Sequence, residues 1–164
     1  MSNLNQEFEY ILAIEDTKGQ RIIPLNKDMY SLGRASNNSI IVYDRQVSRY
    51  HATLLRQKQR SNEYLFWIVD GNLKGRKSTN GIFINGEYRT HHKLKIGDLI
   101  SFGDRTKARY YQFSGKTVEL FKSVQNMGQS LMSKVLIQEE NYKETKIENY
   151  KETRIGNYKE TMIA

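Results

Sequence analysis

The chain has no cysteine, and this absence excludes two kinds of stabilisation at once. Neither a disulfide nor a thiolate metal site can form, so the 164 residues must fold around a hydrophobic core. This length is enough for one ordinary domain with a smaller addition, whereas two large domains would not fit.

Long apolar runs and an export signal are also missing. No apolar stretch approaches the roughly 20 residues that a membrane-spanning helix needs. The first ten residues, MSNLNQEFEY, carry neither a basic n-region nor an apolar h-region, so they do not resemble a signal peptide. We therefore expect a soluble cytoplasmic protein that does not bind a membrane.

Histidine is scarce, and its placement argues against catalysis. The three histidines are His51, His91 and His92. The last two are adjacent and would point to opposite faces of a strand, so they cannot easily chelate one metal ion. Ser48 and His51 are close in sequence, as a nucleophile and its base would be, but no orienting carboxylate or oxyanion-hole motif accompanies them. We expect no enzyme, no metal and no cofactor.

Positive charge is concentrated in the first 115 residues. The chain carries a net charge of +8 from 26 Lys and Arg against 18 Asp and Glu. Residues 1–115 hold 18 of the basic and 11 of the acidic side chains, which gives them +7. Such a field favours an anionic partner, either nucleic acid, a membrane surface or a phosphorylated protein. Charge alone does not choose among these partners.

Residues 8–114 have the pattern of an all-β fold. Short runs rich in Ile, Val, Tyr and Phe are broken every eight to twelve residues by turn residues, which is typical of a sandwich, and helical periodicity is absent. Asn85-Gly86 is the strongest hairpin signal, because both residue types tolerate positive φ. Further turns are expected at Lys18-Gly19 and Ile96-Gly97-Asp98. The expected strands are Phe8–Ile14, Arg21–Leu25, Ile40–Val42, His51–Gln57, Tyr64–Asp70, Ile82–Ile84, Lys93–Leu94, Leu99–Phe102 and Arg109–Phe113.

A different pattern begins after Gly115. Apolar and amide residues share one side of a helix, so residues 116–138 are predicted to form an amphipathic helix or a linker. Gly128 weakens this helix by about 1 kcal/mol relative to Ala. Residues 139–164 contain Asn-Tyr-Lys-Glu-Thr-x-Ile three times with an eight-residue period. Solenoid repeats need about 20 residues or more, so we expect a flexible, low-complexity tail.

The tail repeats place one threonine in each copy, Thr145, Thr153 and Thr161. Two interpretations stay open, and both can hold together. In the first the tail is a flexible low-complexity segment, and in the second it is also an array of three equivalent short motifs. In the second interpretation the threonines are candidate phosphorylation sites, and the array is a multivalent ligand.

Three clusters between the expected strands carry candidate binding chemistry: Gly33-Arg34, Ser48-Arg49-Tyr50-His51 and Ser78-Thr79-Asn80-Gly81. A phosphate monoester with a charge of about −1.5 to −2 needs a guanidinium, hydroxyl donors and backbone N–H groups that converge on one point. Arg34 offers a planar fork that lysine cannot reproduce. Ser48 and Thr79 offer hydroxyls, and the Asn80 amide can both donate to and accept from a peptide backbone.

The order and spacing of these clusters resemble the forkhead-associated (FHA) domain. Gly-Arg, Ser-x-x-His and Thr-Asn-Gly are followed by Asn85-Gly86, Leu94, Gly97-Asp98 and Phe102-Gly103, and the resemblance covers about residues 8–114. Each motif is weak alone, whereas all of them in this order are specific. The resemblance implies a β-sandwich of about eleven strands, within a domain of residues 1–115, whose loops at one end bind phosphothreonine peptides.

The resemblance also implies roles for single residues. Arg34 and Ser48 would hold the phosphate, with Thr79 beside them. Arg49 and Asn80 would contact the peptide backbone near the phosphothreonine. The plainer interpretations are a solvated loop charge for Arg34 and a turn cap for Thr79 and Asn80.

Three further residues would support the loops, namely Gly33, His51 and Gly81. The glycines would otherwise serve turn geometry alone. The segment between Asp70 and Ser78 departs from the family pattern, since many members have a short link where this chain has a basic loop of residues 71–77 that we expect to be flexible. The loop misses the G-x-x-x-x-G-K-[ST] spacing of a P-loop, and it leaves peptide selectivity open.

We therefore predict a phosphothreonine-binding adaptor that acts downstream of a Ser/Thr kinase. A phosphorylated tail threonine could also occupy the pocket in cis or in trans, because 24 extended residues span roughly 80 Å. The alternative is a nucleic-acid-binding basic β-domain. Against it, Phe66, Trp67 and most tyrosines fall in strand patterns that core packing explains, so no stacking platform is evident.

Overall fold

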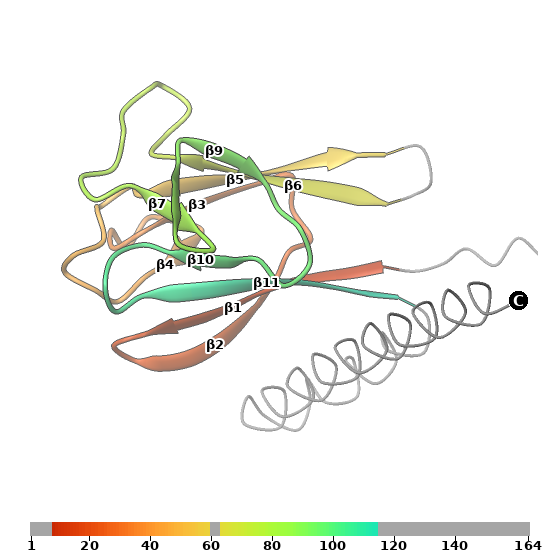
Figure 1. Ribbon diagram of the computed structural model, residues 1–164, viewed down its shortest axis with the longest axis horizontal. Coiled ribbons are helices and arrows are strands. Elements are labelled where there is room, and N and C mark those ends of the chain that lie inside the picture. Colours follow the sequence, from red (N-terminus) through yellow and green to blue (C-terminus); the bar gives the residue numbers. More distant parts are fainter. Residues whose placement is uncertain (1–7, 60–62, 115–164) are drawn as a thin grey trace, which may run out of the picture. The chain divides into compact units, whose positions relative to one another are not determined.

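The computed structural model describes residues 8–59 and 63–114, which form an all-β domain (Figure 1). The predicted helix of residues 116–138 and the repeats of residues 139–164 lie outside the described residues. No helix in the described ranges is long and apolar enough to cross a membrane. The strands are β1 (Phe8–Asp16), β2 (Gly19–Pro24), β3 (Met29–Gly33), β4 (Ile40–Ile41), β5 (Ala52–Lys58), β6 (Tyr64–Asp70), β7 (Ile82–Ile84), β8 (Glu87–Arg89), β9 (His91–Lys93), β10 (Leu99–Ser101) and β11 (Lys107–Ser114).

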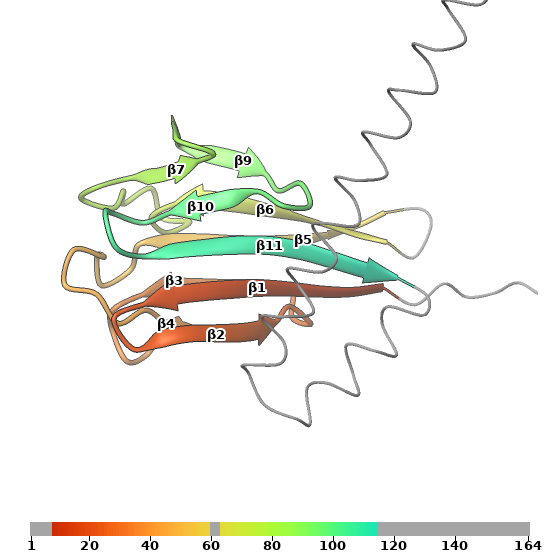
Figure 2. The same cartoon turned by 60° about the horizontal axis from the view of Figure 1, so that its bottom comes forward.

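The eleven strands form two sheets that face each other as the layers of a sandwich (Figure 2). One sheet has the order β2-β1-β11-β10-β7-β8, and the other has the order β4-β3-β5-β6-β9. Neighbouring strands in the described ranges pair antiparallel, except that β3 and β4 are parallel. The expected sandwich of about eleven strands is confirmed.

The core lies between the sheets and follows the two-residue period of the strands. In β6, Phe66 and Ile68 are fully buried, while Trp67 between them is only half-buried on the outer face. In β1, Leu12 and Ile14 point into the same core. Each such side chain contributes about 1.5–3 kcal/mol through burial. Core packing therefore explains Phe66, whereas the expectation that it also explains Trp67 was wrong.

Most expected strands are present, and two were missed. The bounds of β6 and β7 match the expectation, and the Asn85-Gly86 turn that follows β7 has the positive φ values expected, 51° and 86°. The missed strands are β3 and β8. All three residues of β8 are exposed, so no apolar alternation marks it. The strand expected at Lys93–Leu94 is β9, which lies earlier, at His91–Lys93.

The loops that carry the candidate residues gather at one end of the sandwich (Figure 1). The loops after β3, β4, β6 and β10 lie on the left in this view, while β1 begins and β11 ends on the right, where Phe8 pairs with Ser114. The candidate residues are thus held by the rigid strand ends, at the far side from the place where the described chain starts and stops.

Candidate functional site

Ser48 and Thr79 meet at this loop end although they are 31 positions apart. The Thr79 backbone N–H donates to Ser48 Oγ at 2.9 Å, and Ser48 Oγ donates to Thr79 Oγ1 at 3.3 Å. Ser48 is half-buried and Thr79 is exposed. Within the described ranges no acceptor takes the Thr79 hydroxyl proton, so the paired hydroxyls form a surface point that can donate to a ligand.

His51 joins the same two loops from beneath. It is fully buried, its Nδ1 accepts from the Ser48 backbone N–H at 3.0 Å, and its Nε2 lies 2.9 Å from the Gly81 carbonyl oxygen. Since Nδ1 accepts, the ring proton sits on Nε2 and is donated to Gly81. Burial lowers the pKa of His51, against the smaller opposing effects of the Gly81 carbonyl and Asp70. His51 is therefore a neutral brace between the loops.

Gly33 permits the loop after β3 to lie directly on the loop after β4. A Cβ at this position would come within 2.2 Å of the Arg49 carbonyl oxygen and 2.8 Å of the Ser48 carbonyl oxygen. The close approach lets the Arg34 N–H donate to the Ser48 carbonyl oxygen at 3.1 Å. Only glycine leaves room for this contact, so Gly33 is needed for the close packing of the two loops.

Arg34 is thus attached to the site by its backbone, and its guanidinium is exposed. Within the described residues the guanidinium has neither a hydrogen-bond partner nor an ion-pair partner. It lines an open groove of about 550 Å³ together with Tyr43 and Gln46. Ser48 and Thr79 are not among the residues that line this groove. The structure brings the backbones of the three together and leaves the long Arg34 side chain free to serve a ligand.

Arg49 and Asn80 flank the hydroxyl pair. The Arg49 carbonyl oxygen accepts from Ala35 N–H at 3.2 Å and from Asn38 Nδ2 at 2.6 Å, and the Arg49 side chain is exposed. Asn80 Nδ2 donates to the Gln46 carbonyl oxygen at 2.8 Å. One of the Asn80 donors is therefore used to tie two loops together, and its exposed amide retains an acceptor oxygen for a ligand.

Two buried carboxylates that sequence reasoning missed hold these loops. Asp70 Oδ1 accepts from Ser78 Oγ at 2.5 Å, and Ser78 Oγ accepts in turn from the Gly81 N–H at 2.8 Å. Asp44 Oδ2 accepts from the fully buried Thr106 Oγ1 at 2.8 Å. The Asp70–Ser78 pair left some trace in the sequence, since an Asp at the end of an expected strand is followed eight residues later by a Ser. The Asp44–Thr106 pair is 62 positions apart and left no local pattern.

The basic loop of residues 71–77 is a hydrogen-bonded turn, which the expectation of a flexible loop did not include. Asn72 Oδ1 accepts from the Lys74 and Arg76 N–H groups, each at 3.0 Å. Gly71 has a φ of 77°, and a Cβ there would lie 1.8 Å from the Arg76 carbonyl oxygen. The three basic side chains of the loop, Lys74, Arg76 and Lys77, are exposed, and two of their backbone N–H groups make these hydrogen bonds.

The other two histidines lie away from these loops, on β9. His91 is exposed and lies against Trp67, with ring centroids 6.4 Å apart. His92 Nε2 lies 2.8 Å from Asp98 Oδ2. Within the described ranges no group of three His, Asp or Glu side chains is arranged to hold a metal ion.

A family comparison matches part of this domain. The FHA domain model matches residues 30–103, which run from β3 into the loop between β10 and β11. The match includes every candidate phosphopeptide-binding residue, while Thr106 lies outside it. A curated relative, the uncharacterized protein sll1895 of Synechocystis sp., is 34% identical over 101 residues. That match covers 62% of this chain and only 14% of the relative's length.

Solved structures agree on the fold. The crystal structure of the Slr1951 protein from Synechocystis sp. is 35% identical, with a TM-score of 0.61 over 63% of this chain and 97% of that one. The FhaA FHA domain complexed with the intracellular domain of Rv3910 is 25% identical, with a TM-score of 0.51 over 62% and 98%. A structure from work on phosphothreonine-dependent FHA domain interactions is 24% identical, with a TM-score of 0.52 over 63% and 95%.

Proposed function

Because this chain belongs to the FHA domain family, we propose that it is an adaptor that binds phosphothreonine in a partner protein and catalyses no reaction. The binding domain is residues 1–115, and the phosphate is added by a Ser/Thr kinase. Two solved relatives support this class of partner, one studied for phosphothreonine-dependent interactions and the other complexed with an intracellular protein domain.

The observation that carries the proposal is the convergence of three loops on the hydroxyl pair. Ser48 and Thr79 are in contact, and the Arg34 backbone is bonded to Ser48. Hydrogen bonds from a guanidinium to a phosphate are about twice as strong as those between neutral groups. A free Arg34 guanidinium, on a backbone bonded to the loop that holds these hydroxyls, therefore suits a doubly charged oxyanion.

The supporting residues keep this arrangement assembled before the ligand arrives. His51 binds the Ser48 N–H on one loop and the Gly81 carbonyl on the other, and Gly33 allows the loop after β3 to lie against both Ser48 and Arg49. Preorganised donors lose little freedom on binding, so more of the interaction energy appears as affinity.

The peptide backbone on either side of the phosphothreonine is assigned to Arg49 and Asn80. A second open groove, of about 520 Å³, begins at Asn80 and is lined also by Gln46, Phe83 and Asp104. An extended peptide that leaves the phosphate site past Asn80 would lie in it, and the exposed Asn80 amide oxygen is positioned to accept from its backbone.

The tail gives the same site a regulatory ligand. Thr145, Thr153 and Thr161 are proposed as phosphorylation sites whose phosphates compete for the pocket in cis or join chains in trans. Three equivalent sites on one segment raise the local concentration of ligand at the pocket. Deletion of residues 141–164 from the phosphorylated protein should then raise its affinity for an external phosphopeptide.

The test is a binding titration of the full chain against a phosphothreonine peptide library at fixed salt, with the three tail sequences included. Arg34→Lys keeps the charge and removes the fork, and it should weaken binding by about 1.5–3 kcal/mol, or roughly 10- to 150-fold. Arg56→Lys is the matched control, since Arg56 lies on β5, away from the loops, and pairs with Asp28. Equal affinity of the wild type for phosphorylated and plain peptides would overturn the proposal. Affinity that instead follows nucleic acid and falls steeply with salt would favour the basic β-domain alternative.

A further inference from the structure

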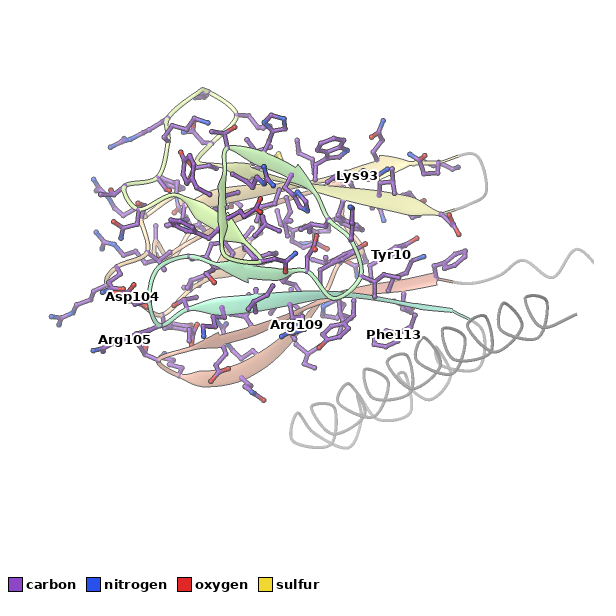
Figure 3. The ribbon with its side chains drawn as sticks, in the orientation of Figure 1. Tyr10, Lys93, Asp104, Arg105, Arg109 and Phe113 are labelled. Carbon is purple, nitrogen blue, oxygen red and sulfur yellow. The ribbon has the colours of Figure 1, made fainter. Side chains whose placement is uncertain are left out.

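The Arg34 side chain lines one groove with two other arginines that have no role in the proposed phosphothreonine site. The two are Arg45 from the loop after β4 and Arg105 from the loop after β10, and we call the groove the arginine groove. Arg105 lies at the loop end of the sandwich beside Asp104 (Figure 3). Three separate loops thus contribute one guanidinium each to one open groove of about 550 Å³.

The three guanidiniums outnumber the one carboxylate that lines the arginine groove with them, that of Asp44. Within the described part of the chain none of the three makes an ion pair or a hydrogen bond, since the nearby carboxylates accept from other donors. Asp44 binds Thr106 and the Gln46 N–H, and Asp104 accepts from Gln46 Nε2 at 3.5 Å. Unpaired like charges held on neighbouring loops repel one another, so the groove is favourable for an anion.

The floor of the arginine groove adds further positive charge and rigidity. Tyr43 lines it, with Lys18 Nζ 3.7 Å and the Arg21 guanidinium carbon 4.9 Å from the centre of its ring. The Thr17 hydroxyl donates to the Tyr43 carbonyl oxygen, and Asp16 accepts from the Tyr43 N–H at 3.0 Å. Arg21 is paired with Asp16 at 2.6 Å, whereas Lys18 adds a further cation over the Tyr43 ring.

Resting on the function proposed above, we propose that the arginine groove binds a second oxyanion of the same ligand, placed a few residues from the phosphothreonine. Arg34 belongs to both places, since its backbone is bonded to Ser48 and its side chain lines the groove. An extended peptide advances about 3.3 Å per residue, so an anion one to three residues away is within reach. The anion is a Glu or Asp carboxylate or a second phosphate, which share the chemistry that guanidiniums recognise.

The chain's own tail contains this pattern. Glu144, Glu152 and Glu160 each precede the threonine of one repeat directly. A phosphorylated repeat would therefore present a carboxylate next to its phosphate. Peptides with the tail sequences can be used to test binding of a second anion in the arginine groove.

The experiment measures dissociation constants of the full chain at one fixed ionic strength. The parent probe is a phosphothreonine peptide with neutral flanks, and the test probes carry a single Glu at each of the three positions before and after the phosphothreonine. A further probe carries a second phosphothreonine at the best of these positions. At least one Glu position should tighten binding about ten-fold, and a larger gain from the phosphate would identify a doubly phosphorylated ligand.

Variants then show which residues cause the gain in affinity from the added anion. Arg45→Gln combined with Arg105→Gln should abolish this gain and leave the affinity for the parent probe unchanged. Lys74→Gln combined with Arg76→Gln removes the same charge from the basic loop and should leave the gain intact. The inference is overturned if no Glu position tightens binding, if the gain persists without Arg45 and Arg105, or if the control variant removes it equally. Failure of the parent probe to bind would instead refute the phosphothreonine site itself.

Discussion

Substitution of Gly33 by alanine tests how the loop end is assembled. The new Cβ would lie 2.2 Å from the Arg49 carbonyl oxygen, where real contacts are longer than 3.0 Å. The loops after β3 and β4 must then separate by about 1 Å, a strain typical of overpacking. At that separation the bonds from the Arg34 and Ala35 N–H groups, now 3.1 and 3.2 Å long, are lost.

The magnitude follows from these contacts. Two backbone hydrogen bonds are worth about 0.5–1.5 kcal/mol each, and the residual strain adds about 1 kcal/mol or more, so the free energy of unfolding should fall by about 2–4 kcal/mol. The affinity for a phosphothreonine peptide should fall as well, because Arg34 moves away from Ser48. Urea denaturation and peptide titration of the same sample measure both effects.

Gly97→Ala is the matched control. Its φ of 87° is unfavourable for alanine, but a Cβ there meets nothing within 4 Å. It should cost about 1–2 kcal/mol of stability through backbone strain alone and leave peptide affinity unchanged. A Gly33→Ala protein with wild-type stability and wild-type affinity would refute the reasoning about loop contact.

Three further predictions concern single features of the domain. The free energy of unfolding should be greatest above pH 6.5 and fall below it by at most about 1.4 kcal/mol per pH unit, because burial lowers the pKa of His51 from its ordinary 6.5 and the unfolded chain therefore takes up the proton first. Urea midpoints from pH 5 to 8 measure this dependence. The prediction is contradicted if stability does not change over this range and His51→Asn shows the same profile. Ser48→Ala should weaken phosphopeptide binding about ten-fold or more while stability changes by about 1 kcal/mol or less, since the hydroxyl lies at the surface; calorimetric titration and thermal melts separate the two effects. Phe66→Ala should cost about 3–5 kcal/mol, because the ring is fully buried between the sheets, and a loss below 1 kcal/mol in urea would contradict that placement.

The sequence predicted those parts of the fold that depend on local pattern. β6 alternates buried and outward side chains, so its period and bounds were readable, and Asn85-Gly86 marked a turn that requires positive φ. β3 and β8 were not readable. β8 is exposed throughout and exists because the turn returns the chain alongside β7.

In the candidate site, too, the residues in short motifs could be predicted from the sequence and the long-range contacts could not. Ser48, Thr79 and Asn80 were predicted because short motifs mark them, and the contact between Ser48 and Thr79 agrees with the expectation that their loops meet. The bond between Asp44 and Thr106 could not be predicted, because it joins residues 62 positions apart with no local pattern. The same holds for the arginine groove, since a single Arg in a loop gives no sign of which other loop it will face.

Phosphothreonine binding is tested most directly by one peptide in two forms, with threonine and with phosphothreonine, titrated against the full chain at fixed salt. Phosphorylation should tighten binding by two orders of magnitude or more, since a dianion gains several charge-assisted hydrogen bonds that a hydroxyl cannot make. Arg34→Lys should reduce this difference roughly 10- to 150-fold. Binding that is the same for both peptides, or a difference that Arg34→Lys leaves unchanged, would contradict this prediction.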